Sequence, residues 1–167
     1  VDMFELIWNG LEAKANLCIV SLELKDWGKP ARLSILDDGE GIDFNRIDTN
    51  FGRFNESAKK GDFSQHGTHG RGRLAFHKLA HIATWYTKNL QGEAVISISS
   101  DNIKNFAAEI LGPNESHNTI ENNSGTLVVL KGVHGSFPDR QDILQLLSKE
   151  FGWFLALNPS KQLIFND

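Results

Sequence analysis

The chain has 167 residues, of which 40% are hydrophobic and 23% are charged, as in an ordinary soluble domain with one core. A formal charge of −4 and a pI near 5.9 exclude a bulk attraction for nucleic acid or an acidic membrane surface. The single cysteine, Cys18, excludes an internal disulfide and fits a reducing compartment. No apolar run approaches the roughly 20 residues that cross a bilayer, so we expect a cytoplasmic protein with no membrane partner.

The first predicted element is an amphipathic helix over residues 5–15, ELIWNGLEAKA. Its apolar positions share one face: Phe4, Ile7, Leu11 and Ala15. Its polar positions fall within roughly 60° of one another on a separate face: Glu5, Asn9 and Glu12. An amide between two carboxylates suits Mg²⁺, and a carboxylate one turn away could take a proton from an attacking water. A surface helix with scattered polar residues is the alternative interpretation.

Two strands follow at residues 17–24 and 31–36, and they predict an antiparallel hairpin. The second strand runs directly into DDGEGI at residues 37–42. A carboxylate at a strand end, followed by two glycines, places an acceptor beside backbone that a flat ligand can approach closely. The exocyclic amine of adenine is a donor for such an acceptor. An acidic turn is the alternative, whereas a calcium loop is disfavoured because Asn45 and Asp48 do not supply the EF-hand register.

Residues 43–49 predict a short helix capped by Asp43, and residues 50–72 predict a long, glycine-rich loop. The loop ends in G-x-x-G-x-G, directly before an apolar helix predicted over residues 74–80. Backbone amides at a glycine-rich helix start bind phosphate oxygens. Four basic side chains add positive charge to the same stretch: Lys59, Lys60, Arg71 and Arg73. The spacing matches neither the Rossmann nor the Walker order, so this motif alone is not specific for phosphate.

Four histidines lie in or after this loop, and they raise the question of a zinc site. His66 and His69 lie within the loop, whereas His77 and His81 are spaced i, i+4 on the predicted helix. That spacing can bind zinc, but the glutamate of H-E-x-x-H and nearby cysteines are absent from this stretch. We therefore expect surface or half-buried histidines without a metal.

The rest of the chain predicts mainly scaffold. It comprises strands at 82–87, 94–99, 106–111, 125–130 and 162–165, a polar loop at 112–124 and an amphipathic helix at 139–151. The order of elements predicts an α+β fold, a two-layer sandwich with helices on one face of a mixed, mostly antiparallel sheet.

Four motifs, in order, resemble those of the GHKL ATPase superfamily (DNA gyrase B, the ninety-kilodalton heat-shock chaperones, histidine kinases and MutL), whose Bergerat fold binds ATP. Residues 5–13 resemble its N-box, E-x-x-x-N-x-x-D-A, with Glu12 in place of the aspartate, and residues 37–41 resemble its adenine-binding D-x-G-x-G box. Ser57-Ala58-Lys59, with residues 67–72, resembles the ATP lid and its glycine box, and Gly125-Thr126 resembles the last box. The resemblance spans residues 5–130 and is closest to the MutL, chaperone and MORC-like branches.

The resemblance implies a Mg²⁺-dependent ATPase whose site residues can be assigned position by position. Glu5 would be the general base, Asn9 would ligate Mg²⁺ and Glu12 would orient the site. Asp37 would accept from the adenine amine, helped by Thr126 through water. The adenine subsite would also include Gly39, Gly41 and Ile42. The lid, at about residues 43–72, would give phosphate contacts from its second half and the residue after it: Ser57, Lys59, Gly67, Thr68, His69, Gly70, Arg71, Gly72 and Arg73.

The resemblance also implies an output. Glutamate at position 5 favours hydrolysis, with lid closure and homodimerisation of the full-length protein coupled to action on DNA or a client protein. We expect residues 1–167 to be a single domain of a larger protein. Its hydrolysis in isolation would be weak, because in MutL and gyrase a following domain supplies a lysine to the γ-phosphate. The alternatives are a histidine-kinase-like catalytic domain that transfers phosphate to a partner, and a nucleotide-binding interaction module without turnover.

Overall fold

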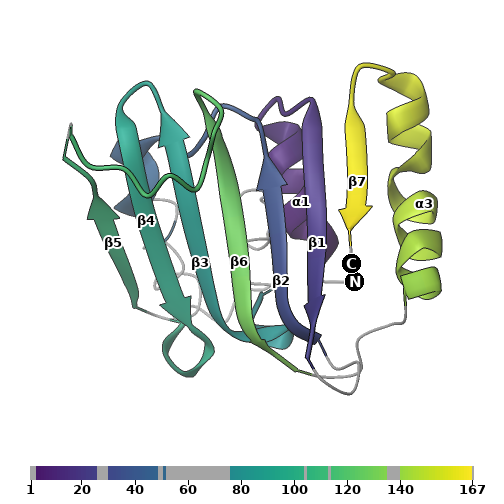
Figure 1. Ribbon diagram of the computed structural model, residues 1–167, viewed down its shortest axis with the longest axis horizontal. Helices are drawn as coiled ribbons and strands as arrows, with labels where there is room; N and C mark the ends of the chain where they lie inside the picture. Colours follow the sequence, from purple (N-terminus) through teal and green to yellow (C-terminus); the bar gives the residue numbers. More distant parts are fainter. Residues whose placement is uncertain are drawn as a thin grey trace, which may run out of the picture.

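A seven-stranded sheet forms the frame of the molecule, in the strand order β5-β4-β3-β6-β2-β1-β7 (Figure 1). The structure is a computed structural model that describes residues 3–25, 30–48, 51, 76–103, 105–112, 114–134 and 140–166. The strands are β1 (Leu17–Leu24), β2 (Pro30–Asp37), β3 (Ala80–Asn89), β4 (Gly92–Ser99), β5 (Phe106–Ile110), β6 (Gly125–Val133) and β7 (Gln162–Asn166). Neighbouring strands are antiparallel except β1 and β7, which run parallel.

Within the described residues, two α-helices accompany the sheet, α1 (Met3–Glu12) and α3 (Arg140–Leu157). In Figure 1, α1 lies behind the sheet, and α3 stands beside the edge strand β7. The Trp8 ring of α1 lies 4.8 Å from the Phe151 ring and 5.0 Å from the Phe154 ring of α3, between ring centroids. Trp8 Nε1 also donates to Glu150 Oε1 at 3.2 Å. These contacts fix α3 against the outer side of α1. Neither helix is long and apolar enough to cross a membrane.

The core lies between α1 and the sheet, where strand alternation puts every second side chain inward. Inward residues on neighbouring strands are almost completely buried: Val20, Leu33, Ile35, Ala83, Trp85, Ile96, Val128 and Leu130. The apolar side of α1 covers them with Phe4, Ile7 and Leu11, as its periodicity predicts. Short 3₁₀ helices in the described part of the chain include η2 (Phe44–Arg46) and η5 (Ser100–Asn102).

The α+β class, the mixed sheet and the predicted hairpin are confirmed, whereas one predicted helix is wrong. Residues 76–78 form a single 3₁₀ turn, and β3 already begins at Ala80. Phe76 is fully buried with its ring 6.0 Å from the Trp85 ring, and Ala80 pairs with Val133 of β6. Sheet pairing therefore overrides the apolar run that predicts a helix over residues 74–80.

The two long helices are predicted correctly in place but not in extent. The first ends at Glu12, before the predicted end at residue 15, and the last continues to Leu157, beyond the predicted end at residue 151. The longer α3 has a packing reason, because Phe154, two residues after Gly152, contacts Trp8 of α1. Burial of this added turn outweighs the weak helix propensity of glycine.

Candidate functional site

Asp37 is a buried carboxylate at the end of β2, with only 6% of its surface exposed. The sheet register pairs it with Cys18 of β1 and Thr126 of β6, and Thr126 in turn pairs with Thr87 of β3. Directly paired residues of antiparallel strands point to the same face. The inward face thus carries a polar row across three strands, made of Asp37, Thr126 and Thr87, at the upper end of the sheet in Figure 1.

Three glycines from separate segments lie against Asp37. A Cβ atom at Gly10 of α1 would lie 2.9 Å from Asp37 Cβ, and one at Gly39 would lie 2.9 Å from Asp37 Oδ1. A Cβ atom at Gly125, whose φ is +148°, would lie 2.3 Å from the Asp37 carbonyl oxygen. Since real Cβ atoms avoid such distances, any side chain at these positions would displace Asp37 or its strand. The first, second and last sequence motifs therefore meet around one carboxylate.

The surroundings of Asp37 favour its neutral form. Burial raises the pKa of this carboxyl from 3.8 to about 6, while hydrogen bonds from the backbone N–H groups of Gly39 and Thr126 lower it and the nearby Asp38 raises it. The Gly39 N–H donates to Asp37 Oδ1 at 2.9 Å. Among the described residues, no lysine or arginine forms an ion pair with Asp37. A buried carboxylate without a cation partner is a common feature of ligand sites.

The loop after Asp37 is fixed on two sides. The Glu40 N–H donates to the carbonyl oxygen of Ala13, just after α1, at 2.9 Å. Gly41 adopts a left-handed φ of +75°, and a Cβ atom there would lie 2.3 Å from the carbonyl oxygen of Lys88 on β3. Only glycine fits this close approach to β3. Gly39 and Gly41 therefore have packing reasons of their own, and their place beside a ligand stays a prediction.

Asp38 has a different task from its neighbour. Its Oδ1 accepts from the backbone N–H groups of Asn16 and Leu17, both at 2.8 Å. The side chain therefore satisfies two backbone donors at the start of β1. Of the two adjacent acids, Asp37 belongs to the polar row, and Asp38 accepts hydrogen bonds from the backbone before and at the start of β1.

Cys18, which pairs with Asp37 in the sheet register, is a buried and unreactive thiol. Its surface is 0% exposed, and burial raises the pKa of the thiol to about 12, with further contributions from Asp37 and Asp38. A thiol in this environment does not ionise near neutral pH. The prediction that Cys18 is a small core residue is confirmed.

The polar stripe of α1 leads away from Gly10 toward solvent. Asn9 directly precedes Gly10 and is half-buried, whereas Glu5 and Glu12 are exposed. Glu12 also lines a hollow of about 280 Å³ between α1 and α3, together with Trp8, Leu11, Trp153 and Phe154. Their roles in catalysis and metal binding stay predictions. Among the described residues, no group of three or more His, Cys, Asp or Glu side chains is arranged to hold a metal.

The predicted lid begins at about residue 43, and the structure describes its residues 43–48 and 51, of which Phe51 packs into the core. Asp43 caps η2 as predicted, since its Oδ1 accepts from the Asn45 N–H at 3.0 Å. Phe51 is 5% exposed, with its ring 5.4 Å from the Trp85 ring. The predicted phosphate-binding residues lie outside the described residues and stay predictions: Ser57, Lys59, Gly67, Thr68, His69, Gly70, Arg71, Gly72 and Arg73.

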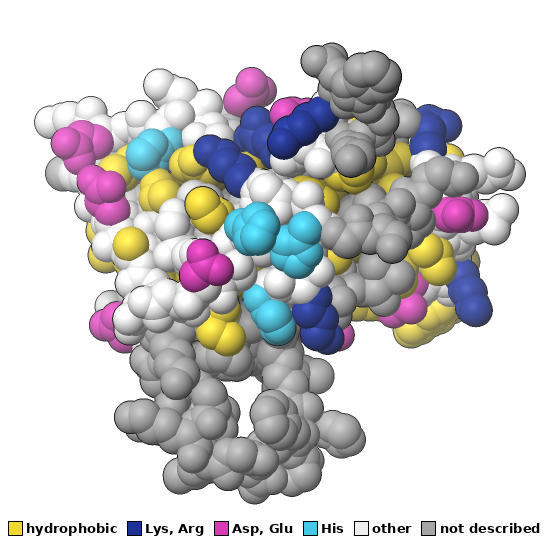
Figure 2. Space-filling view, turned by 90° about the horizontal axis from the view of Figure 1, so that it is seen from below, with side chains coloured by type: hydrophobic (Ala, Val, Ile, Leu, Met, Phe, Trp, Pro, Cys, Tyr) yellow, Lys and Arg dark blue, Asp and Glu magenta, His cyan; other side chains and the backbone are white. Residues whose placement is uncertain are grey.

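Histidines cluster at the opposite end of the sheet, but not on a helix. The expected i, i+4 helical spacing of His77 and His81 is wrong, because His81 is the second residue of β3. Its ring centroid lies 4.9 Å from that of His134, which follows β6. Figure 2 shows histidine side chains gathered on the face seen from below. Because β2 and β3 end at the other side of the molecule, these rings lie away from Asp37 (Figure 1).

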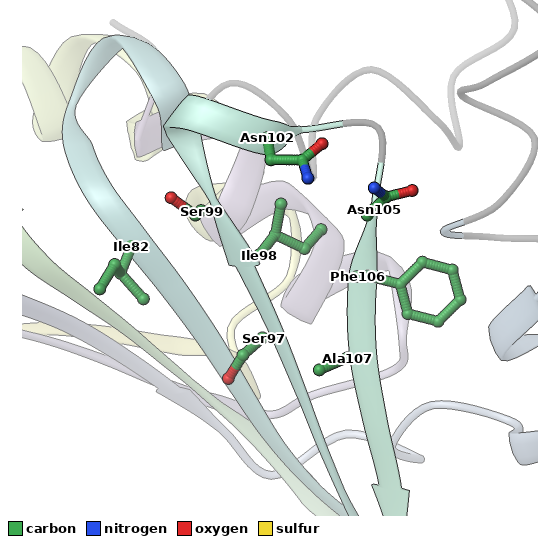
Figure 3. Close-up of a pocket in the computed structure, with 8 residues that line it drawn as sticks. All are labelled: Ile82, Ser97, Ile98, Ser99, Asn102, Asn105, Phe106 and Ala107. Atoms are coloured by element: carbon green, nitrogen blue, oxygen red, sulfur yellow. The ribbon is translucent and has the colours of Figure 1, made fainter.

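A second open hollow, of about 440 Å³, is also remote from Asp37. Figure 3 shows it among Ile82 at the start of β3, Ser99 at the end of β4 and Phe106 at the start of β5. Ile82 points to the face opposite Thr87, because the two residues are five positions apart on one strand. The polar row and this hollow are therefore two separate features of the molecule.

Sequence analysis missed two members of the site. Gly10 sits in a helix, where its contact with a residue of β2 has no local pattern. Thr87 is 2% exposed and bonds three groups around the site. A signal for Thr87 does exist, because it follows Ala83 and Trp85 at every second position of its strand. A threonine at an inward position is unusual enough to mark a polar site.

Comparisons with known proteins bear on the family and the fold. The family described as "Histidine kinase-, DNA gyrase B-, and HSP90-like ATPase" matches residues 2–126. No curated protein matches. Two solved structures are similar over 99% of this chain, each with a TM-score of 0.60: the Aquifex aeolicus MutL ATPase domain complexed with ADP, at 15% identity, and the 43K ATPase domain of Thermus thermophilus gyrase B in complex with an aminocoumarin, at 14% identity. The chain spans 58% of the first structure and 42% of the second, about half their length.

Proposed function

The chain belongs to the histidine kinase-, DNA gyrase B- and HSP90-like ATPase family, and from this membership we propose that it binds ATP with Mg²⁺ around Asp37 and hydrolyses it. The buried carboxylate of Asp37, which forms no ion pair with a lysine or arginine among the described residues, is the observation that carries the proposal. Two backbone N–H groups stabilise this buried charge only in part, because its pKa is still raised, and a further donor such as the exocyclic amine of adenine would stabilise it more. Thr126 supplies a hydroxyl directly beside it.

The residues around Asp37 fit a flat base. Gly10 and Gly39 keep side chains away from the carboxylate, and Gly41 lets the loop pass close to β3. Ile42 is 8% exposed and adds apolar surface to the same loop. A site of a few polar groups set in apolar walls is typical for small ligands. ADP in the MutL structure supports the same ligand class for this chain.

The chemistry of hydrolysis is assigned to the polar stripe of α1. Asn9 would hold Mg²⁺ through its side-chain oxygen, and the metal, when bound, neutralises charge on the phosphates. Glu5 is exposed one turn earlier and would take the proton from the attacking water. Glu12 would orient this stripe. Lid residues 52–72, outside the described residues, would contribute the phosphate contacts, from Ser57 and Lys59 through Gly67, Gly70 and Gly72.

The larger output is a further part of the proposal. We infer lid closure and homodimerisation of a longer protein, coupled to work on DNA or a client protein. The chain spans only about half of the relatives named above, so such work would involve segments beyond residues 1–167. An acid at position 5 supports transfer of phosphate to water over transfer to a partner histidine.

Calorimetric titration with a non-hydrolysable ATP analogue tests the nucleotide site directly. We expect binding that strengthens with Mg²⁺ and is selective over the matching GTP analogue. Asp37→Asn should abolish it, because the amide can present a donor where adenine also has a donor. Asp101→Asn is the matched control, since Asp101 is exposed in η5 after the far end of β4. Equal binding of both nucleotides by the parent protein would contradict the adenine assignment.

Hydrolysis is tested separately, in the longest available form of the protein. Glu5→Ala should keep analogue binding and reduce turnover by 10²-fold or more, the usual contribution of a general base. Turnover at the parental rate would show that Glu5 is not the base.

A further inference from the structure

Thr87 joins three parts of the nucleotide site through one hydroxyl. The Ile42 N–H donates to Thr87 Oγ1 at 2.8 Å. The same oxygen lies 3.3 Å from the Gly125 carbonyl oxygen and 3.3 Å from Thr126 Oγ1. The side chain is 2% exposed, so water does not compete for these contacts. Thr87 thus links β3 to the loop after Asp37 and to the start of β6.

The backbone of Ile42 is held from both sides by β3. Its N–H donates to Thr87, and its carbonyl oxygen accepts from Asn89 Nδ2 at 2.7 Å. The preceding Gly41 would place a Cβ atom 3.2 Å from Thr87 Oγ1, so the loop packs directly on this hydroxyl. The position of the loop beside Asp37 therefore depends on Thr87.

Counting protons limits how the two threonines can be arranged. A hydroxyl has one proton to donate and two lone pairs. Because Thr87 accepts from Ile42, its own proton goes either to the Gly125 carbonyl or to Thr126 Oγ1. In the first arrangement, the remaining lone pair of Thr87 can accept the proton of Thr126. In the second arrangement, Thr126 cannot donate to Thr87 and must donate its proton elsewhere. Thr126 lies between Thr87 and Asp37 in the sheet register, so the side away from Thr87 is the side of the carboxylate.

We propose that the second arrangement is the one adopted with nucleotide, so that Thr87 is a positioning residue that makes Thr126 a hydrogen-bond donor toward the N1 atom of adenine, directly or through one water, and so contributes to adenine selectivity. This inference rests on the proposed function. Adenine presents a donor at its 6-amine and an acceptor at N1, whereas guanine presents an acceptor at O6 and a donor at N1. Asp37 as acceptor and Thr126 as donor match adenine and oppose guanine.

The test combines a protein change with a change in the ligand. ADP and 1-deaza-ADP, in which N1 is replaced by C–H, are titrated into the parent, Thr87→Val and Thr87→Ser. In the parent, removing N1 should weaken binding about tenfold, the value of one good hydrogen bond. In Thr87→Val, ADP should bind about tenfold more weakly, and 1-deaza-ADP should bind nearly as well as ADP. Thr87→Ser keeps the hydroxyl and should behave like the parent.

A matched control lies on the same strand. Thr84 points to the opposite face, where its hydroxyl forms a hydrogen bond with Ser97 Oγ at 3.1 Å. Thr84→Val should therefore change the affinity for neither ADP nor 1-deaza-ADP. Thr87→Cys retains a small side chain with a weak donor, and it replaces the valine variant should that variant unfold.

The outcomes separate this inference from the proposed function. If Thr87→Val binds ADP and still binds 1-deaza-ADP about tenfold more weakly than ADP, Thr87 does not direct the hydroxyl of Thr126, although the proposal of nucleotide binding is upheld. A folded parent that binds no ADP would overturn both. Coupling between the Thr87 hydroxyl and ligand N1 is expected only from the arrangement inferred here, because a purely structural role would weaken both ligands equally.

Discussion

Replacing Asp37 by asparagine should stabilise the ligand-free domain at neutral pH while it abolishes ATP binding. The carboxyl is 6% exposed, and burial is the first cause that raises its pKa to about 6. At pH 7 the folded protein therefore holds an ionised group in a place that favours the neutral form. Asparagine has nearly the same shape, and its carbonyl oxygen can still accept from the Gly39 N–H.

The sign and size of the effect follow from the two pKa values. The folded pKa of Asp37 is above the unfolded value of 3.8, so the folded state binds the proton more tightly. Stability therefore falls as pH rises from about 4 to about 6, and the whole penalty is present above that range. With one pKa unit worth about 1.4 kcal/mol, the rise from 3.8 to about 6 corresponds to about 3 kcal/mol.

Urea unfolding at pH 4 and pH 8, followed by tryptophan fluorescence, measures the effect. The difference in unfolding free energy between Asp37→Asn and the parent should be about 2.5 kcal/mol more favourable to the variant at pH 8 than at pH 4, because about 0.5 kcal/mol of the penalty is already present at pH 4. Asp101→Asn, at an exposed position, should show no such dependence. A variant that differs from the parent by the same amount at both pH values would refute the argument, because the buried charge would then contribute nothing.

Two further predictions concern packing and reactivity. Gly10→Ala should lower the unfolding free energy by about 1–3 kcal/mol and weaken nucleotide binding, because its Cβ atom would lie 2.9 Å from Asp37 Cβ. Gly152→Ala in α3 is the control, because its Cβ atom would meet nothing within 4 Å. The better helix propensity of alanine should raise the unfolding free energy of this variant by as much as about 1 kcal/mol. A lower unfolding free energy in both variants would contradict the packing account. Cys18, with a pKa of about 12, should react with a disulfide reagent at pH 8 about a thousandfold more slowly in the folded protein than in urea, and similar rates would show that the thiol is accessible.

Local patterns were sufficient for the frame of the fold. The alternation in residues 17–24 predicts β1 because every second side chain is buried, and the run DDGEGI correctly marks the end of β2. The helix predicted over residues 74–80 failed because Phe76 and Ala80 satisfy a sheet rather than a helix. An apolar run is compatible with both environments, and only the pairing with Val133 of β6 decides between them.

The neighbours within the site could not be predicted in the same way. Thr87, Thr126 and Asp37 stand side by side only because β6 inserts between β3 and β2, and this strand order is a property of the whole sheet. Motif spacing pointed to Asp37 and Thr126 separately through the family resemblance. It carried no information on Thr87, which belongs to no motif and whose hydroxyl reaches the site through its register position on β3.

The convergence of glycines on Asp37 explains why the separate motifs behave as one unit. Gly10 belongs to the first motif, Gly39 to the second and Gly125 to the last, and each would put a Cβ atom within 3 Å of an Asp37 atom. Gly10 and Gly39 approach the Asp37 side chain, whereas Gly125 approaches its backbone carbonyl oxygen. One shift of the Asp37 side chain could relieve part of the contact at both Gly10 and Gly39, so the effects of alanine at these two positions should not add. The motifs are thus spaced along the sequence by the elements that connect them, while their glycines all approach one residue, Gly10 and Gly39 at its side chain and Gly125 at its backbone.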